Sequence, residues 1–289
     1  MIKRRISQLT ALLILHSSWG PEMKWLCNPV LSCHSCVLAW FACPVGVFVH
    51  YSGYHAIPFF AIGTVLLIGV LAGRLFCGWV CPLGFLTDML HKIPSPKFNM
   101  PGWTAYIKYG VLGAGVIGLP FVFGESTNWS FCRVCPASAV QVTVPNLMLG
   151  SYGEIGLGTV VKLAVLAGVL VLAIMSSRSF CKVFCPIGAM LAPLNYVSFW
   201  VVKPPRPACA DCGKCDRACP SGNEPSSRIL AGLPANRAAD CIVCHDCRNA
   251  CPVVKRRQQE DKVPAMCAPP SMPETGEQPG QTLANPSEP

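Results

Sequence analysis

Apolar residues gather in four long blocks along the chain, separated by polar or cysteine-rich stretches. The blocks are Ile6–Trp19, Phe59–Phe76, Thr104–Gly124 and Ile155–Met175. A membrane-spanning helix needs about 20 mostly apolar residues, and glycine and proline are common in such helices. The pattern therefore predicts an α-helical integral membrane protein with four transmembrane helices.

The first block is the shortest, and it follows Lys3, Arg4 and Arg5, as the apolar core of a cleaved signal peptide would. The small residues that mark a cleavage site do not follow it. We therefore favour a helix that stays in the mature protein over one that is removed.

Charged residues make up only 13% of the 289 residues, about half the usual share for a soluble domain. The net charge is +9, and most basic residues lie at one end of the apolar blocks. These are Lys3, Arg4, Arg5, Arg74, Lys92, Lys97, Lys108, Arg178, Lys182, Lys203 and Arg206. Positive residues favour the cytoplasmic side, so we expect a multi-pass protein of the bacterial inner membrane with both termini cytoplasmic. No basic face is interleaved with aromatic residues, which argues against nucleic-acid binding.

A polar segment with two dense cysteine runs follows Lys203. Each run has the spacing Cys-x2-Cys-x2-Cys-x3-Cys-Pro, in which three thiolates hold one [4Fe–4S] cluster and the fourth holds the other. The predicted ligands are Cys209, Cys212, Cys215 and Cys251 for cluster 1, and Cys219, Cys241, Cys244 and Cys247 for cluster 2. Structural zinc is the weaker alternative, because zinc sites usually pair two separated Cys-x2-Cys knuckles. Residues 203–260 are therefore predicted to form a cytoplasmic, α+β module like a bacterial ferredoxin.

The apolar part repeats a second cysteine motif, with Cys77, Cys81 and Pro82 in one copy and Cys181, Cys185 and Pro186 in the other. If the helix continues through each motif, residues four apart share one face, and the proline then ends or redirects the helix. Arg74 and Arg178 precede the motifs. They could offset negative charge or anchor at the membrane interface.

Further cysteines lie in the two stretches expected on the outer side. These are Cys33, Cys36 and Cys43 in the first, and Cys132 and Cys135 in the second. Cys43 aligns with Cys135 through Cys-Pro, whereas Cys33 and Cys36 align with Cys132 and Cys135 through Cys-x2-Cys. The repeat predicts two tandem two-helix halves, residues 1–97 and 98–202. The inner and outer cysteines could each ligate additional clusters, act as redox-active dithiols or disulfides, or pack as inert thiols.

Three polar side chains in the apolar part are candidates for a quinol site: His50, His55 and Lys162. A quinol needs a proton acceptor, and histidine titrates in a suitable range. The alternatives are an aromatic belt at the interface for the histidines and a snorkelling side chain for Lys162.

Together these features resemble the membrane polyferredoxins, which include NapH-type quinol dehydrogenase subunits, the membrane part of NosR-type proteins, MauN-type proteins and CcoG-type copper reductases. The resemblance covers roughly residues 1–255 and is most specific over Arg74–Gly84, Arg178–Gly188 and Cys209–Pro252. It implies electron transfer between the quinone pool, cytoplasmic donors and a periplasmic redox protein or cytochrome. A copper-reducing assembly factor and a transporter or structural subunit that senses redox state are the competing functions. Residues 261–289 are rich in Pro, Ser, Gly and Glu, which predicts a disordered tail.

Overall fold

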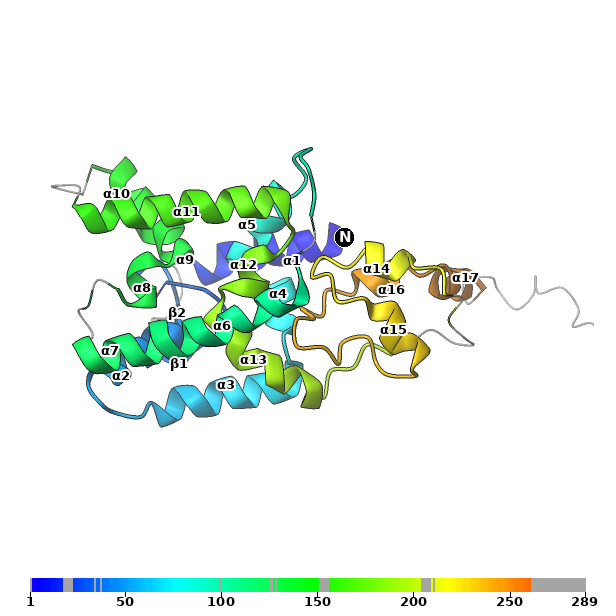
Figure 1. The fold of residues 1–289 in the computed structure, drawn as a ribbon, viewed down its shortest axis with the longest axis horizontal. Helices are drawn as coiled ribbons and strands as arrows, with labels where there is room; N and C mark the ends of the chain where they lie inside the picture. Colours follow the sequence, from blue (N-terminus) through cyan, green and yellow to red (C-terminus); the bar gives the residue numbers. More distant parts are fainter. Residues whose placement is uncertain are drawn as a thin grey trace, which may run out of the picture.

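The computed structural model describes residues 2–17, 23–33, 35–36, 38–98, 100–124, 127, 129–150, 156–203, 209 and 211–260. The expected disordered tail lies outside the described residues. The longer helices run along the long axis of the molecule, and the cysteine-rich module lies at one end, beside the start of the chain (Figure 1).

The first half contains α1 (Ile2–Leu15), β1 (Met23–Cys27), β2 (Phe41–Ala42), α2 (Pro44–Gly53), α3 (Phe59–Ala72), α4 (Leu75–Trp79) and α5 (Pro82–Leu90). The two strands form a parallel pair. A continuous helix over Gly102–Phe123 opens the second half, as η1 (Gly102–Tyr106), α6 (Ile107–Gly110), η2 (Val111–Gly118) and α7 (Leu119–Phe123). The rest of that half is α8 (Phe131–Val134), α9 (Pro136–Ser138), η3 (Ala139–Thr143), α10 (Val144–Met148), α11 (Leu157–Met175), α12 (Ser179–Val183) and α13 (Pro186–Val197).

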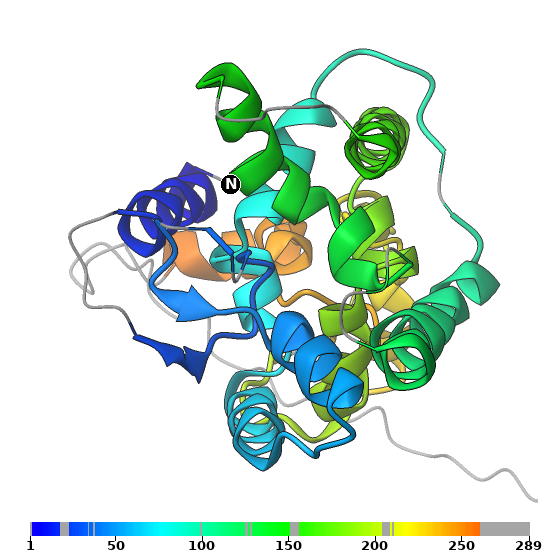
Figure 2. The same cartoon turned by 90° about the vertical axis from the view of Figure 1, so that its left-hand side faces the viewer.

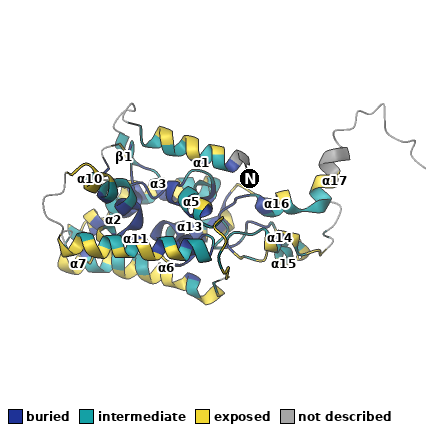
Figure 3. Ribbon diagram, turned by 90° about the horizontal axis from the view of Figure 1, so that it is seen from above, coloured by how far each residue is buried: buried dark blue, intermediate teal, exposed yellow. Residues whose placement is uncertain are grey.

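Two helices are long and apolar enough to cross a membrane, Gly102–Phe123 with 22 residues and α11 with 19. Only 17% of the most apolar stretch of each is buried, so neither resembles the core helix of a soluble protein. Many of their residues are exposed, including apolar ones such as Val122 and Leu157 (Figure 3). Helices α1 and α3 have 14 residues each, about 21 Å at 1.5 Å per residue, which is short of the ~30 Å hydrocarbon core. The described residues thus contain two helices that could span a membrane, where four spans were expected.

Two stretches of π-helix each precede a proline, η2 before Pro120 and η3 before Pro145. A proline lacks an N–H donor, and its ring collides with the carbonyl one turn earlier. A widened turn at this point relieves the collision and keeps the helix continuous.

The motif with two cysteines folds alike in both halves, and it corrects one expectation. Helix α3 ends at Gly73, which has φ +60°, a backbone conformation that glycine adopts readily. Helix α4 then ends at Trp79, and Cys81 precedes α5 as its N-cap. Cys77 and Cys81 therefore do not share one helix face, because the chain turns between them. The expected redirection by Pro82 is confirmed, since α5 begins at that proline.

The two halves interlock. Helix α5 of the first half packs on α11 of the second, and α13 of the second packs on α3 of the first. In the end view, α1, α3, α11 and Gly102–Phe123 stand around the rim, with the shorter elements between them (Figure 2). One apolar core contains residues of both halves and also Ile242 and Cys244 of the module.

The module contains α14 (Lys214–Arg217), α15 (Pro225–Leu230), α16 (Asp246–Ala250) and α17 (Pro252–Glu260). The described residues of the module, 209 and 211–260, contain no strand, so the expected α+β architecture is wrong for them. The sequence after Cys251 is rich in Lys, Arg, Gln and Glu, which favour helix. The stretch before Cys241 is instead held as an irregular loop by Asn195, whose side-chain nitrogen donates to the carbonyls of Asn236 and Ala238.

Candidate iron–sulfur centres

The cysteines of the module line two small cavities, and each cavity contains one of the predicted ligand sets. The first is lined by Cys209, Cys212, Cys215 and Cys251, together with Cys247. The second is lined by Cys219, Cys241, Cys244 and Cys247. The crossed arrangement, in which the fourth cysteine of each run joins the other set, is the one that a two-cluster ferredoxin requires. The residues present therefore fit two [4Fe–4S] clusters.

Burial makes these thiols hard to ionise without a metal. It raises the pKa of Cys241 to about 11 and that of Cys247 to about 12, and for Cys247 the neighbouring charge of Cys241 adds to the rise. A metal is bound by the thiolate, so iron binding displaces a proton from each cysteine. Bound iron would supply the positive charge that these buried sulfurs need.

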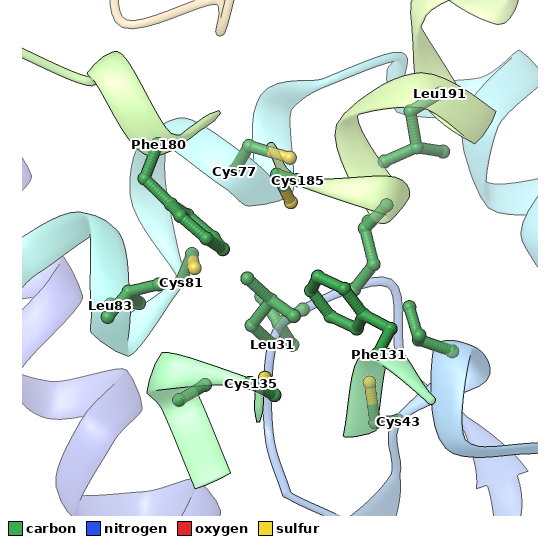
Figure 4. Close-up of a cluster of buried hydrophobic side chains, with 14 of the residues drawn as sticks. Leu31, Cys43, Cys77, Cys81, Leu83, Phe131, Cys135, Phe180, Cys185 and Leu191 are labelled. Carbon is green, nitrogen blue, oxygen red and sulfur yellow. The ribbon is translucent and has the colours of Figure 1, made fainter. Parts of the chain in front are cut away.

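The two halves before the module bring four further cysteines together, which we call the inner cysteine group: Cys77, Cys81, Cys181 and Cys185. All four are buried, with 5–7% of each residue exposed. Burial raises the pKa of Cys77, Cys81 and Cys185, and in each case the charge of Cys181 raises it further. The expectation that the inner cysteines of the two halves meet is thus confirmed by the fold. Figure 4 shows Cys77, Cys81 and Cys185 around one space.

Two arginines hold the inner cysteine group by crossing between the halves. Arg74 of the first half donates to the carbonyl oxygen of Cys181 at 3.2 Å, and Arg178 of the second donates to that of Cys77 at 2.9 Å. Each arginine is 1% exposed, so neither anchors at a membrane interface. A Cβ added at Gly84 would lie 2.1 Å from Nη1 of Arg178, which leaves room only for glycine. Gly188 has the equivalent place, 2.8 Å from Nη2 of Arg74.

Buried carboxylates pair with these arginines and with neighbouring cations. Asp88 accepts from Arg178 at 2.7 and 2.8 Å and from Arg4 of α1 at 3.0 Å. Arg4 also bonds Asp246 of the module at 2.6 Å. Asp240 of the module pairs with Arg74 at 3.3 Å and with Lys108. The network ties α1, both motifs and the module into one unit.

A second set of four cysteines lies towards the opposite end, and we call it the outer cysteine group: Cys33, Cys43, Cys132 and Cys135. Burial raises the pKa of Cys43, with added repulsion from Cys132 and Cys135. Burial also raises the pKa of Cys135 to about 11, with added repulsion from Cys33. In Figure 4, Cys43 and Cys135 lie beyond Leu31 and Phe131 from the inner cysteines. Like Cys81 and Cys185, both stand immediately before a proline that begins a helix.

Two cysteines of each half meet in the outer cysteine group. Cys43 and Cys135 match through Cys-Pro, and Cys33 joins Cys132. Gln141 positions Cys33, because its side-chain oxygen accepts from the backbone nitrogen of Cys33 at 2.6 Å. Cys36 is directed elsewhere, since its sulfur lies 3.8 Å from the carbonyl oxygen of Gln141.

All four outer cysteines line a cavity of about 670 Å³, which we call the outer cavity. His50 lines it as well. His55 lies to the side, where its ring packs against Phe121 at 4.3 Å between centroids, so the structure brings only one of the two histidines to this cavity. Lys162 donates to Oγ of Ser138, a lining residue, at 2.7 Å. It therefore points to the cavity wall and does not snorkel away.

Comparison with known proteins shows a family that the chain resembles. The family described as a 4Fe-4S binding domain (Fer4_5) matches twice, at residues 54–101 and 159–204. YccM of Escherichia coli, which carries an electron transport name, is 24% identical over 69% of this chain and 54% of its own length. MauN of Methylobacillus flagellatus, a methylamine utilization ferredoxin-type protein, is 29% identical over 55% of this chain and 53% of its own length. The chain is therefore similar to proteins of the membrane polyferredoxin-like family.

A further relative of the chain is the uncharacterized protein MJ0750 of Methanocaldococcus jannaschii. It is 28% identical over 65% of the chain and 73% of its own length. The chain thus spans about half to three quarters of the length of the curated relatives it matches. No solved structure matches it. The names of the relatives support an iron–sulfur electron-transfer role.

Several positioning residues of the chain were missed by reasoning from sequence. They are Asp88, Asp240, Asp246, Lys108 and Gln141. The signal for Asp88 was a lone carboxylate close to an apolar motif, because a buried charge of this kind requires a partner. The other four carry no pattern in the sequence, since their partners lie far away along the chain.

Proposed function

We propose that this chain is a membrane-bound iron–sulfur protein that relays electrons between the quinone pool or a cytoplasmic donor and a periplasmic redox partner. The observation that carries the proposal is the pair of module cavities, each lined by one predicted ligand set. When bound there, [4Fe–4S] clusters accept and release single electrons. Cys209, Cys212, Cys215 and Cys251 hold cluster 1, and Cys219, Cys241, Cys244 and Cys247 hold cluster 2.

Membrane insertion is supported by the two exposed apolar helices, Gly102–Phe123 and α11. The basic residues of the chain place the module and both termini on the cytoplasmic side in this proposal. The outer cavity would then face the periplasmic side. Reporter fusions after Val202 and after Trp129 test the orientation. An active periplasmic reporter at Val202 would reverse it.

The outer cavity is the proposed quinol site. Its wall is formed by apolar residues such as Val45 and Phe131, with a few polar groups among them, the usual composition of a small-molecule site. His50 is the group in the lining that suits proton acceptance from a quinol hydroxyl. Lys162 supplies positive charge behind Ser138.

Iron analysis of the full chain, purified without oxygen in detergent, tests the proposed function. At least about eight irons per chain are expected from two four-iron clusters. The variant Cys212→Ser with Cys244→Ser removes one ligand of each cluster and should lose them. Cys36→Ser is the matched control, because Cys36 is buried, is in neither ligand set and has its sulfur 3.8 Å from the carbonyl oxygen of Gln141. Stoichiometric zinc in place of iron would overturn the proposal.

A further inference from the structure

The inner cysteine group has the number and type of ligands that a four-iron cluster needs. Each segment matched by the 4Fe-4S family contains only two cysteines, Cys77 and Cys81 in one and Cys181 and Cys185 in the other. A [4Fe–4S] cluster takes four thiolates, so neither segment suffices alone. The interlocked halves supply both pairs to the same buried place.

A four-iron cluster and a single metal ion need different arrangements of cysteines. The described cysteines are all free thiols. Within the described residues, no three His, Cys, Asp or Glu side chains converge closely enough to hold one metal ion. A four-iron cube has one thiolate on each of its irons, so its ligands surround a volume and do not converge on a point.

Positive charge and hydrogen-bond donors surround the inner cysteine group. A cluster held by four thiolates is negatively charged, and a buried charge needs compensation. Arg74 and Arg178 are fully buried beside the group. The Nε atom of Arg74 is buried without a hydrogen-bond partner. A buried donor is normally satisfied, and a thiolate or cluster sulfur at Cys77 would satisfy this one.

Backbone donors add to this environment. Cys185 precedes the first turn of α13, and the backbone nitrogen of Gly188 donates to its sulfur at 3.4 Å. Cys81 has the same place before α5. Hydrogen bonds to sulfur of this kind stabilise negative charge on a cluster and adjust its reduction potential.

The inner cysteine group also lies directly against the module. A Cβ added at Gly78 would be 2.3 Å from the carbonyl oxygen of Ile242, between two predicted ligands of cluster 2. Trp79 donates its ring N–H to the carbonyl of Val243 at 3.0 Å. Ile242 and Cys244 belong to the same apolar core as Cys77 and Cys81. The module and the inner cysteine group are therefore in direct contact.

We propose that Cys77, Cys81, Cys181 and Cys185 together bind a third [4Fe–4S] cluster, shared between the two halves. The inference rests on the proposed function, because it makes this cluster the next redox centre after cluster 2. The step is the transfer of one electron between them: one cluster is oxidised as the other is reduced. No bond forms or breaks, and no proton moves.

Iron counting on matched variants of the full chain tests the third cluster. Cys77→Ser with Cys181→Ser should lower the iron content by about four per chain relative to the wild type. It should also remove one paramagnetic signal from the spectrum of the dithionite-reduced protein. Cys36→Ser should change neither. An unchanged iron content in the double variant would overturn the proposal while leaving the proposed function intact.

A complementary variant covers the case in which the double variant fails to insert. Cys212→Ser with Cys244→Ser should lose the two module clusters and still retain about four irons. Complete loss of iron from that variant would overturn the third cluster, as would copper or zinc bound at the inner cysteines. A wild-type content below about eight irons would instead count against the proposed function.

Discussion

The inner and outer cysteine groups are built from the same unit but have different surroundings. In both, a cysteine stands before a proline that begins a helix, and each half contributes two cysteines. The inner group is closed by two buried arginines and lies against the module. The outer group opens onto a cavity of about 670 Å³, with Lys24 in its lining and Lys162 bonded to the lining residue Ser138. The difference indicates a held cofactor at the inner end and an exchangeable molecule at the outer end.

The largest expected effect concerns Asp88, which closes the inner group. Asp88→Ala leaves Arg178 without a carboxylate and removes one of the two carboxylates that pair with Arg4, and breaking a buried ion pair costs about 3–5 kcal/mol. The free energy of unfolding in mixed micelles measures the loss. Glu224→Gln, at an exposed carboxylate, should stay within about 0.5 kcal/mol of the wild type. Equal effects of the two variants would show that the network around Asp88 is not needed.

Substitution of His50 tests the proposed quinol site in the outer cavity. His50→Gln should lower kcat/KM for quinol oxidation by about a hundredfold, because the proposed proton acceptor is lost. Iron content should not change. His55→Gln is the control, since His55 packs on Phe121 beside the cavity. If both variants lose activity alike, the outer cavity is not the quinol site.

Glycine substitutions test whether Arg74 and Arg178 each reach the cysteines of the other half. Gly84→Ala forces Arg178 to move, and overpacking of this kind costs about 1–3 kcal/mol. In α11, Gly168→Ala meets nothing within 4 Å among the described residues and should be neutral or slightly stabilising. Thermal unfolding of the two variants measures the difference. A neutral Gly84→Ala would contradict the close contact between the halves.

The smallest effect is expected at Lys162. Lys162→Met removes the hydrogen bond to Ser138, which is worth about 1 kcal/mol. A double-mutant cycle with Ser138→Ala isolates this contribution. The inner group and the iron content should be unaffected. A coupling free energy of zero would show that Lys162 does not act through Ser138.

Cysteine spacing and charge placement allowed much of the candidate site to be predicted. Local spacing determined both module ligand sets, because consecutive thiolates wrap one cluster within a few residues. The start of α5 at Pro82 also followed from local chemistry. The turn at Gly73 did not, because an isolated glycine in an apolar block is also ordinary within a membrane helix. It shortened α3 to 14 residues, and the end of α4 at Trp79 then separated Cys77 from Cys81.

The ion pairs that could not be predicted from the sequence join residues that lie far apart along the chain. The pairing of Arg4 with Asp246 joins residues 242 positions apart, and that of Arg74 with Asp240 joins residues 166 apart. Such partners depend on how the halves interlock, which no local pattern encodes. Arg74 and Arg178 stood out in the repeat, but only the fold shows that each serves the cysteines of the other half.

Electron transfer between the module and a quinone tests the central claim most directly. The full chain, in nanodiscs and with its module clusters reduced by dithionite, is mixed rapidly with a quinone analogue while the cluster absorbance is followed. The wild type and Cys36→Ser should reoxidise at the same rate. Cys77→Ser with Cys181→Ser should slow reoxidation by orders of magnitude, because the inner redox centre between module and outer cavity is gone. Reoxidation of that variant at the wild-type rate would contradict the account and make the inner cysteines packing residues.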